Sequence, residues 1–346
     1  MRILYGVQGT GNGHICRSRL MAKALKQANV EVDYLFSGRE ADQYFAMEDF
    51  GDYQLKSGVT IVSNAGKVEV AKTLRRNFSS AFFSDIRNLD LSNYDLVLND
   101  YEPITAWAAR RQKVPSIGIS HQAALLHSVP KVGVGFMQNL LLEKMAPVDV
   151  SLGCHWHHFG CPIIPPFVDE DAVNVEYSHK VIVYLPFEAP DQIVQFLNDH
   201  NDYQFLVYHG QKPTVELPEH VVWHGFDRTG FKQNLTACGG VICNAGFELV
   251  SEALTLGKRI LVKPLLGQFE QLSNMAALQL LAAADSMMTL DKSALTRWLK
   301  IPQPETVEYP DVATSVVNWI KQGQWQDKQT LSDELWQQAK LPASWR

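Results

Sequence analysis

The chain has 346 residues, of which 46% are hydrophobic and 20% are charged, and its formal net charge is -6 at pH 7. This length corresponds to about two domains of ordinary size. The mildly acidic balance excludes a generally basic nucleic-acid groove, so we expect no nucleic-acid partner. The five cysteines are odd in number and widely spaced, and we find no signal-peptide pattern. We therefore expect a cytoplasmic protein with reduced thiols and no transmembrane segment.

Strand and helix patterns alternate along the first half of the sequence. Short apolar runs predict strands, and apolar residues at helical spacing predict the helices between them. The predicted strands cover residues 2–7, 31–38, 94–100 and 115–120, and the predicted helices cover 17–28 and 104–112. This order predicts a parallel sheet with helical crossovers.

Three prolines, Pro162, Pro165 and Pro166, interrupt this pattern before the alternation resumes. Further strands are predicted at 180–187, 203–209, 220–226, 239–246 and 259–265, with helices at 189–200, 247–257 and 270–284. We predict an α/β fold in which two doubly wound, Rossmann-like domains face a cleft. The N-terminal domain covers 1–165 and the C-terminal domain 166–320, and helices within 321–346 pack back on the N-terminal domain. The boundary falls near 162–178; alternatively, the prolines form a surface loop inside one large domain.

A glycine-rich turn follows the first predicted strand. The sequence GTGNGH places Gly9, Gly11 and Gly13 ahead of His14. The third glycine comes one residue too early for the dinucleotide-binding pattern G-x-G-x-x-G, and no lysine completes a P-loop. The turn instead indicates a backbone that passes close to a ligand and enters a helix whose N–H groups suit a phosphate or oxyanion. The alternative is a tight turn in which the histidine bonds only the loop.

A second turn, in the sequence CNAGFELVSE, has similar properties. The strand ends at Asn244 and a helix follows, so the N–H groups at Gly246 and Phe247 could bind a diphosphate. Glu252 lies one helical turn after Glu248 and could accept hydrogen bonds from ribose hydroxyls. The alternative is that both glutamates form a solvated helix face.

Together, the two turns resemble those of the GT-B glycosyltransferases. The likeness is to the branch that holds the bacterial N-acetylglucosaminyltransferase completing lipid II and the UDP-glucuronosyltransferases, in a group whose donor loop reads GQFEQ. The matching segments are GTGNGH and NAGFELVSEALTLGKRILVKPLLGQFEQLSNMA.

The resemblance implies a role for each matching residue. His14 matches the base that deprotonates the acceptor hydroxyl, Glu252 matches the glutamate that binds the ribose, and Glu270 with Gln271 matches the pair that contacts the donor sugar. The donor-binding residues are Gly11, Gly13, Phe226, Asn244, Gly246, Phe247, Glu252, Glu270 and Gln271. At two of these positions the sequence departs from the family: Asn244 stands where His or Ser is common, and Glu270 stands where Asp is common. The identity of the donor nucleotide and of its sugar is therefore left undecided.

A carboxylate that fixes the histidine tautomer and stabilises the imidazolium would make His14 a better base. Asp100 and Glu102 follow one predicted strand, and His121 follows the next. In plant relatives an Asp at this strand end pairs with the motif histidine, so the resemblance implies that Asp100 is catalytic together with His14. Glu102 and His121 are candidates for the acceptor side. Alternatively, the two acids cap the helix at 104–112.

Three other features bear on cofactors and partners. Phe226 ends a predicted strand, where it either stacks on the nucleobase or lies in the core. The segment CHWHHFGC matches no zinc spacing, and no Asp-x-Asp motif is present, so we expect a metal-independent reaction with no cofactor. The apolar segment 134–146 is expected to be a buried core helix; the alternative is contact with a membrane or a lipid-linked acceptor.

The sequence thus predicts a metal-independent, inverting glycosyltransferase. It would move a sugar from a nucleotide-sugar, with a UDP-sugar favoured, to a hydroxyl acceptor that is a glycan or is lipid-linked. One alternative is a non-hydrolysing nucleotide-sugar 2-epimerase. Another is a non-catalytic protein that binds nucleotide-sugars or glycans on the same fold.

Overall fold

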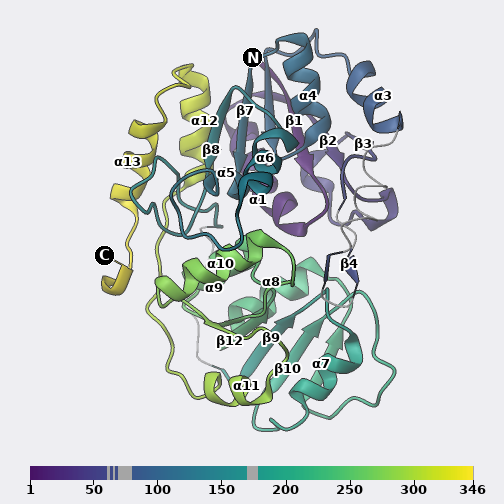
Figure 1. The fold of residues 1–346 in the computed structure, drawn as a ribbon, viewed down its shortest axis with the longest axis vertical. Coiled ribbons are helices and arrows are strands. Elements are labelled where there is room, and N and C mark those ends of the chain that lie inside the picture. Colours follow the sequence, from purple (N-terminus) through teal and green to yellow (C-terminus); the bar gives the residue numbers. More distant parts are fainter. Residues whose placement is uncertain (61–62, 65–66, 69–79, 170–177, 346) are drawn as a thin grey trace.

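A computed structural model describes residues 1–60, 63–64, 67–68, 80–169 and 178–345 (Figure 1). Two six-stranded parallel sheets form two Rossmann-like domains, as the sequence predicts for a GT-B fold. The first sheet has the order β3-β2-β1-β6-β7-β8. Its strands are β1 (Arg2–Gln8), β2 (Glu31–Ser37), β3 (Tyr53–Lys56), β6 (Leu96–Asp100), β7 (Ser116–Ser120) and β8 (Val150–Gly153). The helices of this domain are α1 (Asn12–Gln27), α3 (Ser80–Asn88), α4 (Pro103–Gln112), α5 (His121–Ala124) and α6 (Phe136–Met145), with 3-10 turns at η1 (Ala41–Gln43) and η2 (Glu48–Phe50) and a small hairpin of β4 (Ser63–Asn64) and β5 (Lys67–Val68).

The second sheet has the order β11-β10-β9-β12-β13-β14. Its strands are β9 (Lys180–Tyr184), β10 (Gln204–Tyr208), β11 (Val221–His224), β12 (Gly240–Cys243), β13 (Arg259–Val262) and β14 (Asp285–Ser286). Its helices are α7 (Pro190–Leu197), α8 (Arg228–Ala237), α9 (Phe247–Thr255), α10 (Phe269–Leu280) and α11 (Lys292–Trp298). The central strands of both sheets are apolar and buried on both faces, as parallel sheets covered by helices require.

The glycine in the middle of β1 is needed for the packing of α4. A Cβ atom at Gly6 would overlap the hydroxyl of Thr105, which lies in the first turn of that helix. Because Gly6 carries no side chain, α4 can lie directly on the sheet, and the strand ends around it are held in place.

The chain returns to the first domain at its C-terminal end. α12 (Val312–Gln322) packs on α1, and α13 (Lys328–Gln338) and η3 (Ala343–Trp345) follow. The hydroxyl of Ser332 donates a hydrogen bond to the carbonyl of Ile163. Figure 1 shows these helices, in yellow, alongside the first domain. The expected boundary at 162–178 runs into residues 170–177, which lie outside the described residues.

The apolar segment 134–146 does not form the buried helix expected from its sequence. It forms α6, in which Phe136 is 79% exposed, Met137 is 68% exposed and only Leu142 is buried. The sheet beneath this helix presents small residues such as Gly118 and Ser120, and a cavity of about 260 Å³ lies between them and the helix. The core interpretation was therefore wrong: of the residues of α6, only Leu142 packs into an apolar cluster, with Ala124, Leu125, Val129 and Ile163.

Candidate active site

Two neighbouring strands of the first sheet bring His14 and Asp100 together. β1 and β6 are paired in parallel, with Val7 opposite Asp100, so their carboxyl ends meet at one edge of the sheet. The chain leaves β1 through the glycine turn and enters α1 at Asn12, which places His14 in the first turn of that helix. His14 Nδ1 lies 2.7 Å from Asp100 Oδ1. The contact expected between these residues is therefore present in the structure.

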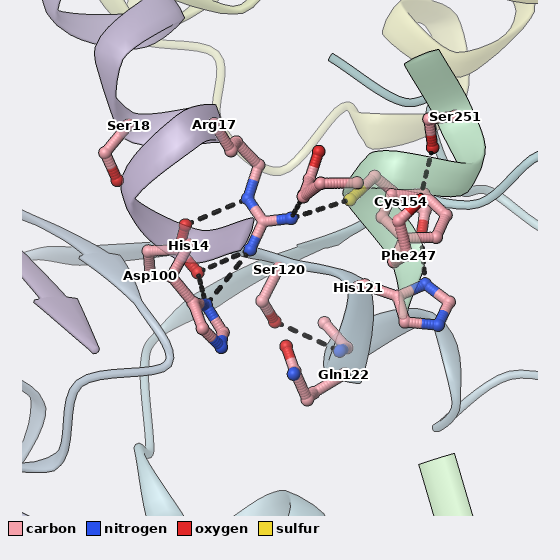
Figure 2. Close-up of polar contacts among 12 residues, drawn as sticks. His14, Arg17, Ser18, Asp100, Ser120, His121, Gln122, Cys154, Phe247 and Ser251 are labelled. Carbon is pink, nitrogen blue, oxygen red and sulfur yellow. Dashed lines mark hydrogen bonds and ion pairs between the residues drawn. The ribbon is translucent and has the colours of Figure 1, made fainter. Parts of the chain in front are cut away.

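The hydrogen bond fixes the tautomer of His14. An ionised carboxylate only accepts, so the Nδ1 atom carries the proton and donates it to Asp100. The other ring nitrogen, Nε2, then keeps its lone pair, and Figure 2 shows it pointing away from Asp100. The side chain of His14 is 13% exposed, so the ring is not fully enclosed by the protein. Such a nitrogen can accept a proton from a hydroxyl group.

Arg17 is a third member of this cluster, and the sequence analysis did not identify it. Its Nε donates to Asp100 Oδ2 at 2.9 Å and its Nη2 donates to Asp100 Oδ1 at 2.7 Å. Burial alone would raise the pKa of Asp100, but the charge of Arg17 and the hydrogen bonds from Arg17 and His14 hold the pKa below its usual value. Arg17 Nη2 also lies 3.2 Å from His14 Nδ1, but both atoms are donors, so we assign the hydrogen bond of Nδ1 to Asp100.

The second domain reaches this cluster through α9. Arg17 Nη1 donates to the carboxyl group of Glu248, which lies in the first turn of α9. A Cβ atom at Gly13 would lie 2.9 Å from Glu248 Cγ, so only glycine allows the two helices to approach this closely. Gly11 is the N-cap residue of α1 and has no side chain with which to cap the helix. At Gly13 this space is taken by Glu248 of α9, whereas at Gly11 an added Cβ atom would meet only the ring of His14, at 3.9 Å.

The start of α9 combines free N–H groups with a tightly held backbone. Gly246 is its N-cap residue and provides no side-chain cap, so the first N–H groups of the helix, from Phe247 on, remain available. The N–H of Gly246 itself, expected to bind a diphosphate, donates to the carbonyl of Asn244 at 2.7 Å instead. The side chain of Phe247 stacks on His121 at a ring distance of 4.0 Å. Asn244 Nδ2 donates to the carbonyl of Lys263 at 2.8 Å, and its buried Oδ1 has no partner among the described residues. This end of α9 has the features of an anion site.

The two glutamates of α9 are not a solvated helix face. Burial raises the pKa of Glu248 to about 8 even though Arg17 opposes the shift. Glu252 points toward α8 of the second domain, where it lines a small pocket together with Lys232 and Thr236. Burial raises the pKa of Glu252 to about 7 in spite of the charge of Lys232. Burial thus disfavours the charged form of both carboxyl groups.

Glu270 and Gln271 lie at the start of α10. Glu270 Oε2 accepts a hydrogen bond of 3.1 Å from Gln122 Nε2, across the domain boundary. The buried Gln271 uses its Oε1 to accept from the backbone N–H of Leu265 at 2.7 Å, which holds the loop after β13. Contacts of these two residues with a donor sugar stay a prediction.

The acceptor-side role expected for Glu102 was wrong. Its carboxylate is fully buried and caps α4, accepting hydrogen bonds from the N–H groups of Ile104 and Thr105 and from the hydroxyl of Ser37. Because its oxygens are occupied by the protein, it cannot contact an acceptor. The alternative of a helix cap is the one that the structure contains.

His121 and Phe226 both lie where the two domains meet. His121 is buried, with Nδ1 at 2.9 Å from the carbonyl of Cys154 and Nε2 at 2.6 Å from Asn274 Oδ1, so it does not face an open acceptor surface as expected. The ring of Phe247 stacks on the ring of His121 and covers it. Phe226 is 46% exposed and lies parallel to Phe45 of the first domain, so it is not a core aromatic; its contact with a nucleobase stays a prediction.

No group of three His, Cys, Asp or Glu side chains within the described residues could hold a metal ion. In the segment CHWHHFGC, His155 packs against Trp156 and Phe247, whereas His158 packs against Trp336. Among the same described residues, no helix is long and apolar enough to cross a membrane.

Comparisons with known proteins agree with this architecture. The family model "Glycosyl transferase family 1" matches residues 1–302. Among solved structures, the spinosyn forosaminyltransferase SpnP is 13% identical with a TM-score of 0.57, covering 100% of this chain and 96% of that chain. SnogD of Streptomyces nogalater is 16% identical with a TM-score of 0.55, covering 97% and 96%. MurG of Acinetobacter baumannii is 16% identical with a TM-score of 0.51, covering 93% and 99%. At these identities the likeness shows the fold alone. No curated protein sequence matches the chain.

Proposed function

The chain belongs to glycosyl transferase family 1 and is a glycosyltransferase, and from this premise we propose that it moves a sugar from a nucleotide-sugar to a hydroxyl acceptor with inversion at the anomeric carbon. The proposal requires no metal ion and no cofactor. His14 is its base and Asp100 is the partner of that base.

The observation that carries the proposal is the His14–Asp100 pair at the carboxyl end of the first sheet. Nε2 of His14 takes the proton of the acceptor hydroxyl as its oxygen bonds to the anomeric carbon. The bond from that carbon to the donor diphosphate breaks, and its electron pair leaves with the nucleoside diphosphate. Asp100 stabilises the imidazolium that forms. A base positioned in this way contributes roughly 10²–10⁴-fold to the rate.

The start of α9 supports the second half of the reaction. The diphosphate gains negative charge as it leaves, and the N–H groups of the first turn, from Phe247 on, together with the positive end of the helix dipole, would stabilise that charge. Glu252 would accept hydrogen bonds from the ribose, and Phe226 would stack on the base. Gly11 and Gly13 would let the donor approach α1. A UDP-sugar is the favoured donor.

The exposed face of α6 bears on the acceptor. Its apolar side chains are Phe136, Met137, Leu140 and Leu141, all of them exposed. An acceptor with an apolar portion, such as a lipid-linked glycan, would cover this face, and the protein would then work in the cytoplasm in peripheral contact with a membrane. Binding to anionic liposomes that the double variant Phe136→Ser/Met137→Ser loses would support this part of the proposal.

Nucleotide binding is the first test. Thermal unfolding is measured with UDP, GDP, dTDP and ADP, each with and without Mg²⁺. A ligand at about 100 times its Kd adds roughly 2.7 kcal/mol to the stability, enough for a clear rise in Tm. We expect such a rise with UDP, independent of Mg²⁺. Glu252→Ala should abolish the rise, whereas Glu216→Ala, at an exposed acid of the same domain, should keep it.

Measurements of kcat distinguish the role of His14 as a base from a role in nucleotide binding. His14→Ala should lose about 10²–10⁴-fold in kcat and still show the Tm rise with nucleotide. Full activity of His14→Ala would refute the role of His14. Conversion of the nucleotide-sugar without any acceptor would favour an epimerase, and absence of a Tm rise with every nucleotide would refute the donor site.

A further inference from the structure

The side chain of Arg17 is almost fully buried, which is rare for an arginine unless it is paired with a carboxylate. Its side chain is 2% exposed, and its partners are Asp100, which has no exposed surface, and Glu248, which is 9% exposed. Both oxygens of Asp100 accept from Arg17, in the two-point geometry that a guanidinium can provide and an ammonium group cannot. Figure 2 shows Arg17 between Asp100 and the second domain, with the ring of His14 beside it.

Charge balance explains why a cation is required at this position. Asp100 and neutral His14 alone would form a buried pair in which the imidazole readily takes up a proton, because the resulting imidazolium would neutralise the buried carboxylate. An imidazolium has no lone pair on Nε2, so it cannot accept the proton of a hydroxyl group. Arg17 supplies a positive charge beside Asp100, so the imidazole of His14 need not take up a proton to balance the charge of that carboxylate.

The other partner of Arg17 comes from the opposite domain. Glu248 lies 231 positions further along the chain, in the first turn of α9, next to the N–H groups at Gly246 and Phe247. The position of Arg17, and with it that of Asp100, therefore depends on contact between α1 and α9. The titratable or charged groups packed around His14 and Asp100 are Arg17 of α1, Glu248 of α9, Tyr5 of β1, His121 of α5 and the thiol of Cys154, and burial raises the pKa of that thiol. Glu270 and Glu252 lie further out.

We propose that Arg17 is a positioning residue of the active site: it holds the Asp100 carboxylate against His14, supplies the positive charge that balances this carboxylate, and links both to α9 through Glu248. This inference rests on the proposed function. It adds a third residue to the His14–Asp100 pair and makes the assembly of the base depend on contact between the domains.

The test measures the protonation of His14 directly and needs no substrate. The full-length protein is labelled with [¹³Cε1]histidine, and the His14 resonance is identified by its loss in His14→Gln. Its titration between pH 5 and 9 is compared among wild type, Arg17→Gln, Arg17→Lys and Glu248→Gln. Arg2→Gln, which removes an exposed arginine that pairs with Asp33 at the start of β1, is the matched control.

We expect the titration midpoint of His14 to rise by about one pH unit or more in Arg17→Gln, since removal of a nearby cation leaves Asp100 to attract the proton. Arg17→Lys keeps the positive charge but not both hydrogen bonds to Asp100, so the midpoint of His14 should rise by less in this variant. Glu248→Gln keeps the cation and should not raise the midpoint, and Arg2→Gln should match wild type. An unchanged midpoint in folded Arg17→Gln would overturn the proposal. If that variant does not fold, Arg17→Lys decides: a rise supports the proposal and no rise overturns it.

Once a donor and an acceptor are known, the pH profile of kcat gives an independent readout. Arg17→Gln should lose activity mainly below neutral pH and regain it as the pH rises, whereas a residue with only a structural role would lower kcat equally at all pH values. Failure of the glycosyltransferase assignment would leave the histidine titration unaffected, so the two failures can be told apart.

Discussion

The carboxyl group of Glu252 makes a prediction about stability that can be tested before any substrate is known. Its pKa rises from an ordinary value of 4.5 to about 7 in the folded protein, first because of burial. Between these two values the native state keeps a proton that the unfolded state has released. Stability therefore falls as the pH rises through this window, because the unfolded state binds fewer protons than the native state.

The size of the effect follows from the shift. At about 1.4 kcal/mol per pKa unit, the rise from 4.5 to about 7 corresponds to about 3 kcal/mol of unfolding free energy. Glutamine cannot ionise, so Glu252→Gln should gain stability relative to wild type by about 2–3 kcal/mol between pH 5 and pH 8. At any one pH, the sign of the difference in unfolding free energy between Glu252→Gln and wild type depends on how the amide packs. The change of this difference with pH does not depend on that packing.

Urea unfolding at pH 5, 6, 7 and 8 measures this difference. Wild type, Glu252→Gln and the control Glu216→Gln are unfolded under the same conditions, and each midpoint is converted to a free energy with its own m-value. The reasoning would be refuted if the difference between Glu252→Gln and wild type were the same at all four pH values. A pH-dependent difference in the exposed control would point to a change in the unfolded state instead.

Three further predictions concern the framework that holds the site. Glu102→Ala should lower the unfolding free energy by about 3–5 kcal/mol, because it removes a buried helix cap and strands buried donors, and it should leave nucleotide binding intact in a thermal-shift titration. Gly6→Ala should cost about 1–3 kcal/mol through overlap with Thr105, and a double variant with Thr105→Ala should cost less than the two single changes added together. Lys263→Met should cost about 3–5 kcal/mol in urea unfolding, because it leaves Glu188 buried without its cation, and adding Glu188→Leu should recover much of that loss.

The parts of the site that the sequence predicts are those set by sheet geometry. In a parallel sheet the carboxyl ends of neighbouring strands meet, so sheet geometry predicts that the histidine after β1 and the acids at the end of β6 lie at one edge of the sheet. The choice of Asp100 as the partner of the histidine rests on the resemblance to the glycosyltransferases. The free start of α9 follows from a glycine between a strand and a helix in the same way. Both placements at the strand ends use only the order of the elements and the residues at their ends.

The parts that the sequence does not predict depend on which surface covers which. The apolar residues of α6 look the same in the sequence whether a sheet, a membrane or solvent lies against them, so their exposure could not be predicted from the sequence. Glu102 illustrates the same limit. An acid before a helix can cap it or face a ligand, and here the buried Ser37 and Thr105 draw both carboxylate oxygens inward.

Arg17 and the glutamates of α9 show how domain contact gives new roles to residues with simple local patterns. Arg17 follows His14 by one helical turn, which places both on the same face of α1. Glu248 and Glu252 share a face of α9 by the same spacing. Because the first turn of α9 lies at the cleft, Glu248 reaches Arg17, while Glu252, one turn later, lies over the pocket beside α8. A local pattern therefore indicates which residues point the same way, but the approach of α1 to α9 at Gly13 decides that Glu248 meets Arg17, whereas Glu252 lies beside α8.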